Sequence, residues 1–242
     1  MGFLEYADIS FRAFLHSDRQ TELAQRKHSI VQGVYDHYGI TPKTVLYIGF
    51  NPAITLAAAS KIYVADVSQE VLDWFSDSDI TVEEISIDDL GNRGRTFDSV
   101  VALDEYFTFA DSEEDQRAKF EMICKVTRGV VITTVRDYKN LDFKDREFSI
   151  PAVIRGESND LLFLEYHNYS DPDRNSWIRN VYEIEGNGVR STRGFHCRHM
   201  FFKQCAKFGY DAGAQEFLVH KNLMYKSLIR KNYEHVISIK FG

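Results

Sequence analysis

The chain has 242 residues and a mass of 28.0 kDa, with 44% hydrophobic and 27% charged residues, which suits one large domain or two small ones with a substantial core. Only four prolines occur and no segment is low in complexity, which excludes a disordered or collagen-like chain. No uncharged run approaches the roughly 18 residues of a membrane span, and three cysteines are too few for a disulfide framework. We therefore expect a soluble, cytoplasmic protein with no membrane contact.

The net charge of −7 is divided unevenly along the chain. Residues 1–150 carry 16 Lys and Arg against 26 Asp and Glu, a net of −10, whereas residues 151–242 carry 13 against 10, a net of +3. An acidic protein does not attract nucleic acid through its overall field, although a local basic face stays possible.

The N-terminal region divides into an aromatic segment and a helix. Residues 1–16 are apolar without a clean period, so we expect them to lie across the surface of the domain. Ser17 and Gln20 have the spacing of a capping box, and apolar residues then recur at helical spacing until Gly39. The sequence therefore predicts a helix that begins at Ser17.

The next hundred residues alternate between short apolar runs and helical patterns. Helices are predicted from Pro52 through Ser60, after Ser68 and after Ser112. The runs between them predict five strands, at 44–48, 62–65, 80–85, 97–103 and 129–135. Near-continuous apolar strands separated by helices indicate a parallel sheet that is covered on both faces.

After Arg136 the pattern changes to antiparallel pairs. The sequence predicts one inserted hairpin of residues 161–169 and 177–184 with a turn at 171–173, then a turn at Asn187 and Gly188. A helix is predicted over 195–208, followed by strands at 215–219 and 235–241. Because no helical pattern separates these last two strands, they are expected to form an antiparallel hairpin at the end of the sheet.

This order of elements resembles the class I S-adenosylmethionine (SAM)-dependent methyltransferases from about residue 44 to 241, with the Ser17 helix as the leading helix. The resemblance implies an α/β fold with a seven-stranded, mostly parallel sheet, helices on both faces and a C-terminal antiparallel hairpin. It also implies SAM as the cofactor. The chain is then one domain, 1–242, in which residues 1–40 form an N-terminal lid and helix and residues 137–192 form an insertion on the substrate side.

The glycine motif of the family corresponds here to VLYIGFNPA. Gly49 matches the first glycine, and Phe50 and Asn51 complete the turn that approaches the methionine part of SAM. Tyr47 stands where the family has an acid that holds the amine of SAM. Because Asn tolerates positive φ and proline suits a first helical turn, Asn51 and Pro52 can preserve the path of the backbone.

Further motifs of the resemblance follow the next strands. Asp66, with Val67 beside it, matches the acid that accepts hydrogen bonds from the ribose hydroxyls, and its distance of 17 residues from Gly49 indicates a shortened first helix. Ile87 and Asp88 match the pair that contacts adenine, and Asp104 lies at the methionine end. Each position also has a simpler interpretation: Gly49 as an ordinary turn, Asp66 as a helix cap, and Asp88 as a solvated turn.

Candidates for a catalytic base are Glu105, His167 and Asp104, although methyl transfer from a sulfonium depends mainly on positioning and needs no particular base. The arginines and aromatic residues between 136 and 198 suit recognition of an acceptor, a small anionic or polar molecule or a nucleic acid equally, and they suit an ordinary solvated hairpin about as well. His196, Cys197 and His199 do not have the spacing of a metal site, so no metal is expected.

The sequence thus predicts a SAM-dependent methyltransferase that acts on an unidentified small-molecule or nucleic-acid acceptor. A catalytically inactive, methyltransferase-like binding or assembly subunit is the alternative, because Tyr47 and Asn51 depart from the glycine motif. A nicotinamide-dependent enzyme is less favoured, since that class lacks the terminal hairpin. The oligomeric state stays open.

Overall fold

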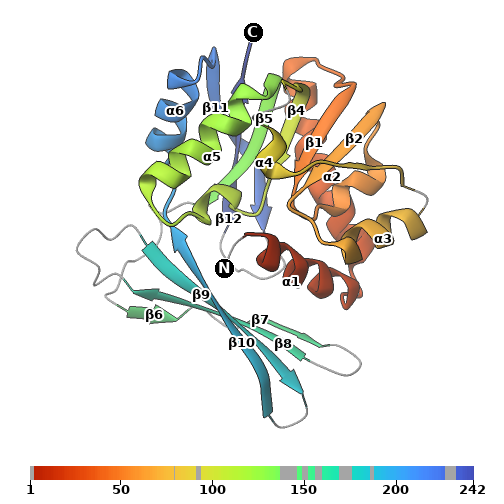
Figure 1. Cartoon of the computed structure of the whole chain (residues 1–242), viewed down its shortest axis with the longest axis vertical. Coiled ribbons are helices and arrows are strands. Elements are labelled where there is room, and N and C mark those ends of the chain that lie inside the picture. Colours follow the sequence, from red (N-terminus) through yellow and green to blue (C-terminus); the bar gives the residue numbers. More distant parts are fainter. Residues whose placement is uncertain are drawn as a thin grey trace.

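Two β-sheets organise the fold in the computed structural model of the chain (Figure 1). The structure describes residues 3–78, 80–90, 94–136, 146–148, 152–155, 160–168, 176–185, 188–226 and 233–242. One sheet is covered by helices on both faces, and the other is an antiparallel sheet built from the insertion after the fifth strand.

The first sheet has seven strands in the order β11-β12-β5-β4-β1-β2-β3. Neighbours from β5 to β3 run parallel, whereas β12 is antiparallel to both β5 and β11. The strands are β1 (Thr44–Ile48), β2 (Lys61–Ala65), β3 (Glu83–Glu84), β4 (Phe97–Ala102), β5 (Thr127–Arg136), β11 (Glu216–Lys226) and β12 (Tyr233–Lys240). The predicted fold class is confirmed, although the third strand is much shorter than the predicted 80–85.

Two groups of helices cover the sheet. Helices α2 (Gln20–Tyr38) and α3 (Gln69–Asp77) pack on one face, while α4 (Ile87–Leu90), α5 (Glu113–Lys125) and α6 (Phe202–Asp211) pack on the other. The side chains of each strand alternate between the two cores. Val45 and Tyr47 of β1 lie in the core of the α2 face, and Leu46 and Ile48 lie in the core of the α5 face. Ser112 caps α5 as predicted, because its Oγ accepts a hydrogen bond from the amide of Asp115 at 3.1 Å.

The aromatic N-terminal segment, whose sequence shows no helical period, forms a helix, α1 (Phe3–Leu15). One side of α1 buries Phe3 and Tyr6 in the core of the α5 face, and another buries Phe11 and Phe14 in the core of the α2 face. A helix that is buried on two sides has no single apolar stripe, which explains the missing period. Helix α1 lies along the edge at which the parallel strands end (Figure 1).

Two predicted helix boundaries near this edge were wrong. Helix α2 begins at Gln20, and the predicted capping box is absent because the Gln20 side chain donates to the carbonyl of Leu15 instead. The predicted helix 52–60 is only a 3₁₀ turn, η1 (Pro52–Leu56), after which the chain returns directly to β2. This shortening agrees with the short separation of Gly49 and Asp66.

The insertion contains more strands than the one predicted hairpin. Its sheet has the order β10-β9-β8-β6, with β7 paired to β8. The strands are β6 (Arg146–Phe148), β7 (Ala152–Arg155), β8 (Asp160–Asn168), β9 (Ser176–Glu185) and β10 (Gly188–Arg198). Strands β8 and β9 confirm the hairpin itself, whereas the predicted turn at 171–173 and Asn187 lie outside the described residues.

The predicted helix 195–208 begins too early, because residues 195–198 end strand β10 and α6 begins only at Phe202. His196 is exposed and Cys197 is fully buried, as expected for neighbours on a strand. Where the structure describes the chain, no three His, Cys, Asp or Glu side chains form a group that could hold a metal ion. No helix among the described residues is long and apolar enough to cross a membrane.

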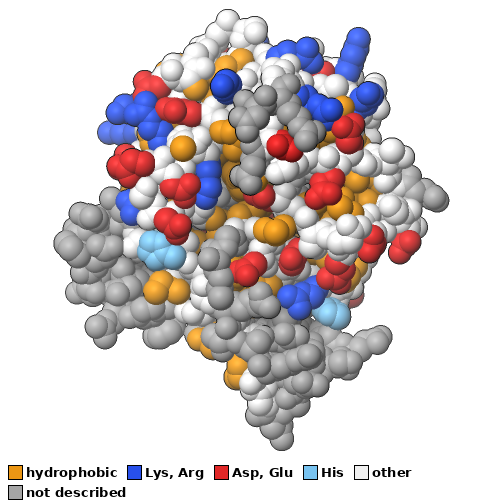
Figure 2. All heavy atoms as spheres, in the orientation of Figure 1, with side chains coloured by type: hydrophobic (Ala, Val, Ile, Leu, Met, Phe, Trp, Pro, Cys, Tyr) orange, Lys and Arg blue, Asp and Glu red, His pale blue; other side chains and the backbone are white. Residues whose placement is uncertain are grey.

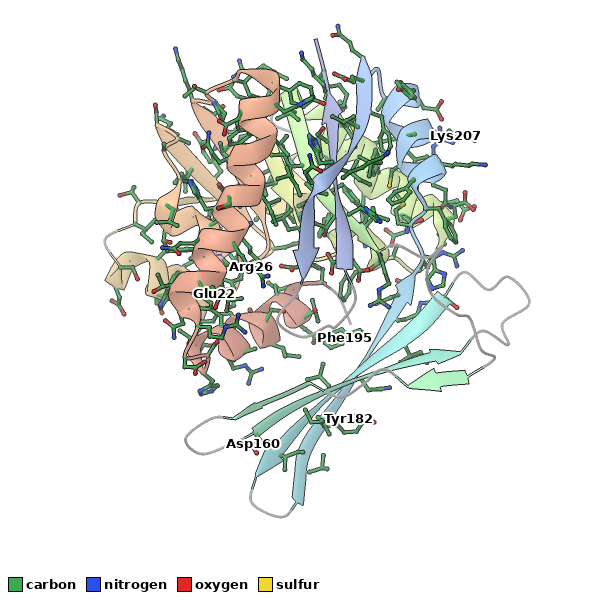
Figure 3. All side chains as sticks on the ribbon, turned by 180° about the vertical axis from the view of Figure 1, so that it is seen from behind. Glu22, Arg26, Asp160, Tyr182, Phe195 and Lys207 are labelled. Carbon is green, nitrogen blue, oxygen red and sulfur yellow. The ribbon has the colours of Figure 1, made fainter. Side chains whose placement is uncertain are left out.

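The second sheet packs on the domain through α1. Phe195 of β10 lies beside α1 in Figure 3, and its ring centroid is 5.8 Å from that of Tyr6. Val181, Phe195 and Cys197 are buried in the same core cluster as Phe3 and Tyr6. Helix α1 therefore lies between the carboxyl edge of the parallel sheet and the inserted sheet.

Candidate functional site

Strands β1, β2, β4 and β5 end together at the edge that α1 covers. Strand β1 lies between β2 and β4, so the chain connections turn in opposite directions on its two sides. In open α/β sheets such a switch point, at the carboxyl ends of the strands, is where ligands bind. The predicted site residues that follow β1, β2 and β4 are therefore brought to one edge.

The turn after β1 keeps one feature of a glycine motif and loses another. Gly49 has a φ of +74°, and its amide donates to the carbonyl of Ala65 at 2.8 Å. Asn51 has a φ of −138°, so our expectation that it supplies a positive φ was wrong. Its Oδ1 instead accepts from the amide of Ala53 at 3.0 Å and caps η1.

Phe3 of α1 covers this turn. A Cβ atom added at Gly49 would overlap the Phe3 ring, so the aromatic side chain lies directly on the bare glycine backbone. The Phe3 ring also contacts Tyr106 and Phe109, with centroids at 4.7 and 5.2 Å. The N-terminal helix thus fills the space beside the turn.

Asp66 directly follows β2 and has a φ of +53°, a conformation that is uncommon for residues other than glycine. Its carboxylate accepts a hydrogen bond from the hydroxyl of Tyr106. Burial, together with the negative charge of Asp66, raises the pKa of Tyr106, so this hydroxyl stays protonated and acts as the donor. Asp66 is only partly buried.

Asp104 lies two residues beyond β4 and pairs with a lysine of α2. Its Oδ2 is 2.6 Å from Nζ of Lys27, and the two side chains are 17% and 9% exposed. The predicted site residue Asp104 therefore forms an ion pair that joins the leading helix to the end of a strand.

Glu105 forms a second pair, which points toward β5. Its Oε1 is 3.2 Å from Nε of Arg136, and the side chains are 0% and 1% exposed. The Glu105 amide also donates to Oγ1 of Thr134 at 3.1 Å. A carboxylate held in this way by a buried guanidinium is a poor proton acceptor, because it would leave the arginine charge without its partner.

Asp66, Asp104 and Glu105 are the three non-glycine residues with positive φ among those that the structure describes. All three are acidic, and all follow the carboxyl ends of β2 or β4. Backbone strain of this kind costs of order 1–3 kcal/mol per residue and concentrates at functional sites. The strained residues therefore mark the same edge as the predicted motifs.

The remaining predicted cofactor residues lie near this edge with varied surroundings. Phe50 and Val67 are buried in the core of the α2 face, where Phe50 contacts Phe11 at 4.8 Å between centroids. Ile87 begins α4 and packs on the core of the opposite face. Asp88 belongs to the same helix, and its side chain lies outside the described part of the structure.

His167, the third candidate base, belongs to β8 of the inserted sheet and is paired in register with Glu147. Its side chain is not among those that the structure describes, so its relation to the site stays a prediction.

Three residues of this edge were missed from the sequence: Phe3, Lys27 and Arg136. Lys27 did carry a signal, because it stands between Leu23 and Ile30 on the buried stripe of its helix. A lysine at an apolar position needs a charged partner. The others lie far in sequence from the residues that they contact, and no local pattern reveals such contacts.

Comparison with known proteins gives matches in structure alone. No model of a protein family and no curated protein matches the sequence. A SAM-dependent methyltransferase from Clostridium acetobutylicum is similar, with a TM-score of 0.67 and 12% identity over 90% of this chain and 92% of that chain. SAM-bound CalS10, an amino pentose methyltransferase from Micromonospora echinaspora, gives a TM-score of 0.62 and 13% identity over 97% and 96% of the two chains.

The sugar N-methyltransferase KedS8 from Streptoalloteichus gives a TM-score of 0.68 and 13% identity over 97% of this chain and 92% of that chain. At such low identity the likeness defines the fold. The chain has the fold of the class I SAM-dependent methyltransferases over nearly its whole length.

Proposed function

We propose that this protein binds SAM at the carboxyl ends of β1, β2 and β4 and uses it to methylate a small polar molecule. The observation that carries the proposal is Asp66, an acid on a strained backbone at the end of β2, at the switch-point edge of this fold. A carboxylate at this place suits the two hydroxyls of a ribose, because each of its oxygens accepts a hydrogen bond.

The residues present at the edge fit such a cofactor chemically. Gly49 has no side chain between its backbone and the Phe3 ring, and Asp66 is only partly buried. The fit has one steric condition: the Phe3 ring lies on Gly49, so α1 has to shift before a ligand can contact that turn. Residues 1–40 then act as the predicted lid, with α1 as the part that moves.

SAM supplies, when it is bound, a methyl group on a positively charged sulfur. The chain then has to orient the acceptor in line with that methyl group and exclude water, which α1 and the inserted sheet are placed to do (Figure 1). Of the candidate bases, Glu105 is held by Arg136 and Asp104 by Lys27. We assign no proton transfer to them, and His167 is the candidate from the inserted sheet.

A small polar acceptor is favoured over nucleic acid by two considerations. The similar structures include enzymes named for an amino pentose and for a sugar nitrogen. On the face seen in Figure 2, the described Lys and Arg side chains are interspersed with Asp and Glu and form no continuous basic patch. Nucleic acid binding relies on such a patch to neutralise phosphates.

Binding can be measured through Trp74, which contacts Phe11 and Phe14 of α1 with ring centroids at 5.9 and 5.7 Å. In a Trp177→Phe variant, Trp74 is the single tryptophan of the chain. Titration with S-adenosylhomocysteine is expected to change its fluorescence in a saturable way, and incubation with SAM and a panel of amino sugars is expected to release S-adenosylhomocysteine. No binding at millimolar ligand would refute the proposal.

A catalytically inactive binding subunit is the second candidate, and two observations favour it. Burial, with the neighbouring Tyr35, raises the pKa of Tyr47, so this residue supplies no negative charge where the family has an acid. Phe3 fills the space beside Gly49. Saturable binding of S-adenosylhomocysteine without methyl transfer to any acceptor of the panel would support this function.

A further inference from the structure

We propose that the ion pair of Lys27 and Asp104 is the receptor for the amino-acid end of the cofactor and takes over the role of the acid missing at Tyr47. This inference rests on the proposed function, because it concerns how the same edge binds SAM. The head group in question is a zwitterion, with an ammonium and a carboxylate on one carbon. An ion pair offers one complementary charge to each.

The pair stands at the right place in the fold. Gly49 is one residue beyond β1 and Asp104 two residues beyond β4, and these strands are neighbours in the sheet. Helix α2, which carries Lys27, packs against η1 immediately after the Gly49 turn. The pair therefore lies beside the turn that approaches the methionine part of SAM in this fold.

Tyr47 cannot serve this purpose. Its side chain is 2% exposed in the core of the α2 face, and burial keeps its hydroxyl protonated. The negative charge for an ammonium group has to come from another residue at this edge. We assign this charge to Asp104. It follows β4, next to the strand that ends at the Gly49 turn, and its backbone is strained there, with a φ of +58°.

The other ion pair at the edge is less suited. Glu105 and Arg136 are completely buried, and the Glu105 backbone is tied to Thr134 of β5. The side chains of Lys27 and Asp104 are 9% and 17% exposed to solvent. Opening a pair that solvent can reach costs less than opening one that is fully desolvated.

Ligand binding then exchanges one ion pair for two. Nζ of Lys27 leaves Oδ2 of Asp104 and contacts the ligand carboxylate, while Asp104 accepts from the ligand ammonium. No bond is made or broken in the chain and no proton is transferred. Charge balance is kept, because the zwitterion has no net charge.

The test compares three ligands by calorimetry on the full-length protein. S-adenosylhomocysteine carries the whole head group, 5′-methylthioadenosine lacks it, and decarboxylated SAM keeps the amine but lacks the carboxylate. We expect S-adenosylhomocysteine to bind about tenfold or more tightly than 5′-methylthioadenosine. Lys27→Met and Asp104→Asn should each abolish most of this preference and leave 5′-methylthioadenosine binding within about threefold. The binding of decarboxylated SAM should be weakened by Asp104→Asn and not by Lys27→Met.

Arg128→Met is the matched control, because Arg128 forms an ion pair with Asp98 at 2.9 Å near the start of β4, at the opposite edge of the sheet. Equal affinity of the wild-type protein for S-adenosylhomocysteine and 5′-methylthioadenosine would overturn the inference without any variant, so it stays testable if Lys27→Met fails to fold. A preference unchanged in Asp104→Asn would also overturn it. Binding of 5′-methylthioadenosine in either case leaves the proposed function intact, whereas failure of every ligand to bind overturns both.

Discussion

The two edges of the parallel sheet use acidic side chains in opposite ways. At the amino edge, Asp98 of β4 accepts hydrogen bonds from the amides of Lys43 and Thr44 at 2.9 and 3.0 Å and from Oγ1 of Thr44 at 3.1 Å. Partial burial raises the pKa of Asp98, but these hydrogen bonds outweigh it and leave that pKa below its ordinary value. This carboxylate fastens the start of β1 to β4.

At the carboxyl edge, acids stand on strained backbone and pair with side chains from distant segments. Asp66 contacts Tyr106, Asp104 contacts Lys27 and Glu105 contacts Arg136. Side-chain partners can be exchanged for a ligand, whereas backbone amides that begin a strand cannot leave without loosening the sheet. The amino edge is therefore built for stability, and the carboxyl edge keeps groups that a ligand can use.

Removal of Arg136 should have the largest effect on stability. Arg136→Met leaves Glu105 buried without its guanidinium, so the free energy of unfolding should fall by about 3–5 kcal/mol. Denaturant melting measures this change. The double variant Arg136→Met and Glu105→Leu should recover part of the loss, and a loss equal to the sum of the single variants would show that the two side chains do not interact.

Gly49→Ala should have the next largest effect. A positive φ costs alanine about 1–2 kcal/mol, and its methyl group would in addition overlap Phe3. Gly39→Ala is the matched control, because Gly39 has a φ of +62° with no atom within 4 Å of an added Cβ. Equal destabilisation of the two variants in thermal melting would mean that α1 does not press on the Gly49 turn.

Asp66→Ala should weaken binding of S-adenosylhomocysteine about tenfold or more by removing a charged hydrogen-bond acceptor. Because Asp66→Ala also leaves the buried Tyr106 hydroxyl without its acceptor, the free energy of unfolding should fall by about 1–3 kcal/mol, so binding is compared at a temperature where both proteins are folded. Tyr106→Phe, which removes the hydroxyl that donates to Asp66, is the companion variant. Calorimetric affinity unchanged in Asp66→Ala would contradict the ribose assignment.

Asp98→Asn should have the smallest effect, and it should depend on pH. Because the pKa of Asp98 is lowered in the folded state, its stabilisation is present above the ordinary value of about 3.9 and is lost as pH falls through the folded value. Between pH 6 and 2 the melting temperature of the wild-type protein should therefore fall more steeply than that of Asp98→Asn. The difference corresponds to about 1 kcal/mol in the free energy of unfolding. Parallel curves for the two proteins would refute this role, and ligand binding at neutral pH should not change.

The parallel sheet could be predicted from the sequence because each strand is a short β-branched run bounded by polar or glycine residues. The N-terminal helix could not, because α1 buries Phe3 and Phe11 in two different cores and shows no single apolar face. The first helix after Gly49 was overestimated, since an alanine-rich segment favours a helix while the short connection to β2 leaves room for only a 3₁₀ turn.

The candidate site, like the fold, could be predicted from the sequence only in part. Asp66 and Asp104 could be predicted, because the ends of parallel strands necessarily share an edge. Their partners could not, because Lys27 and Asp104 are 77 residues apart and no local pattern joins them. Only the position of Lys27 on an otherwise apolar helix stripe indicated that it needed a partner.

The most direct test of the central claim is a crystal structure of the protein with S-adenosylhomocysteine at saturating concentration. We expect ligand density at the carboxyl edge, with the ribose hydroxyls on the Asp66 carboxylate and the Phe3 ring moved off Gly49. A structure from the same conditions in which the edge holds no ligand and Phe3 still covers Gly49 would contradict it.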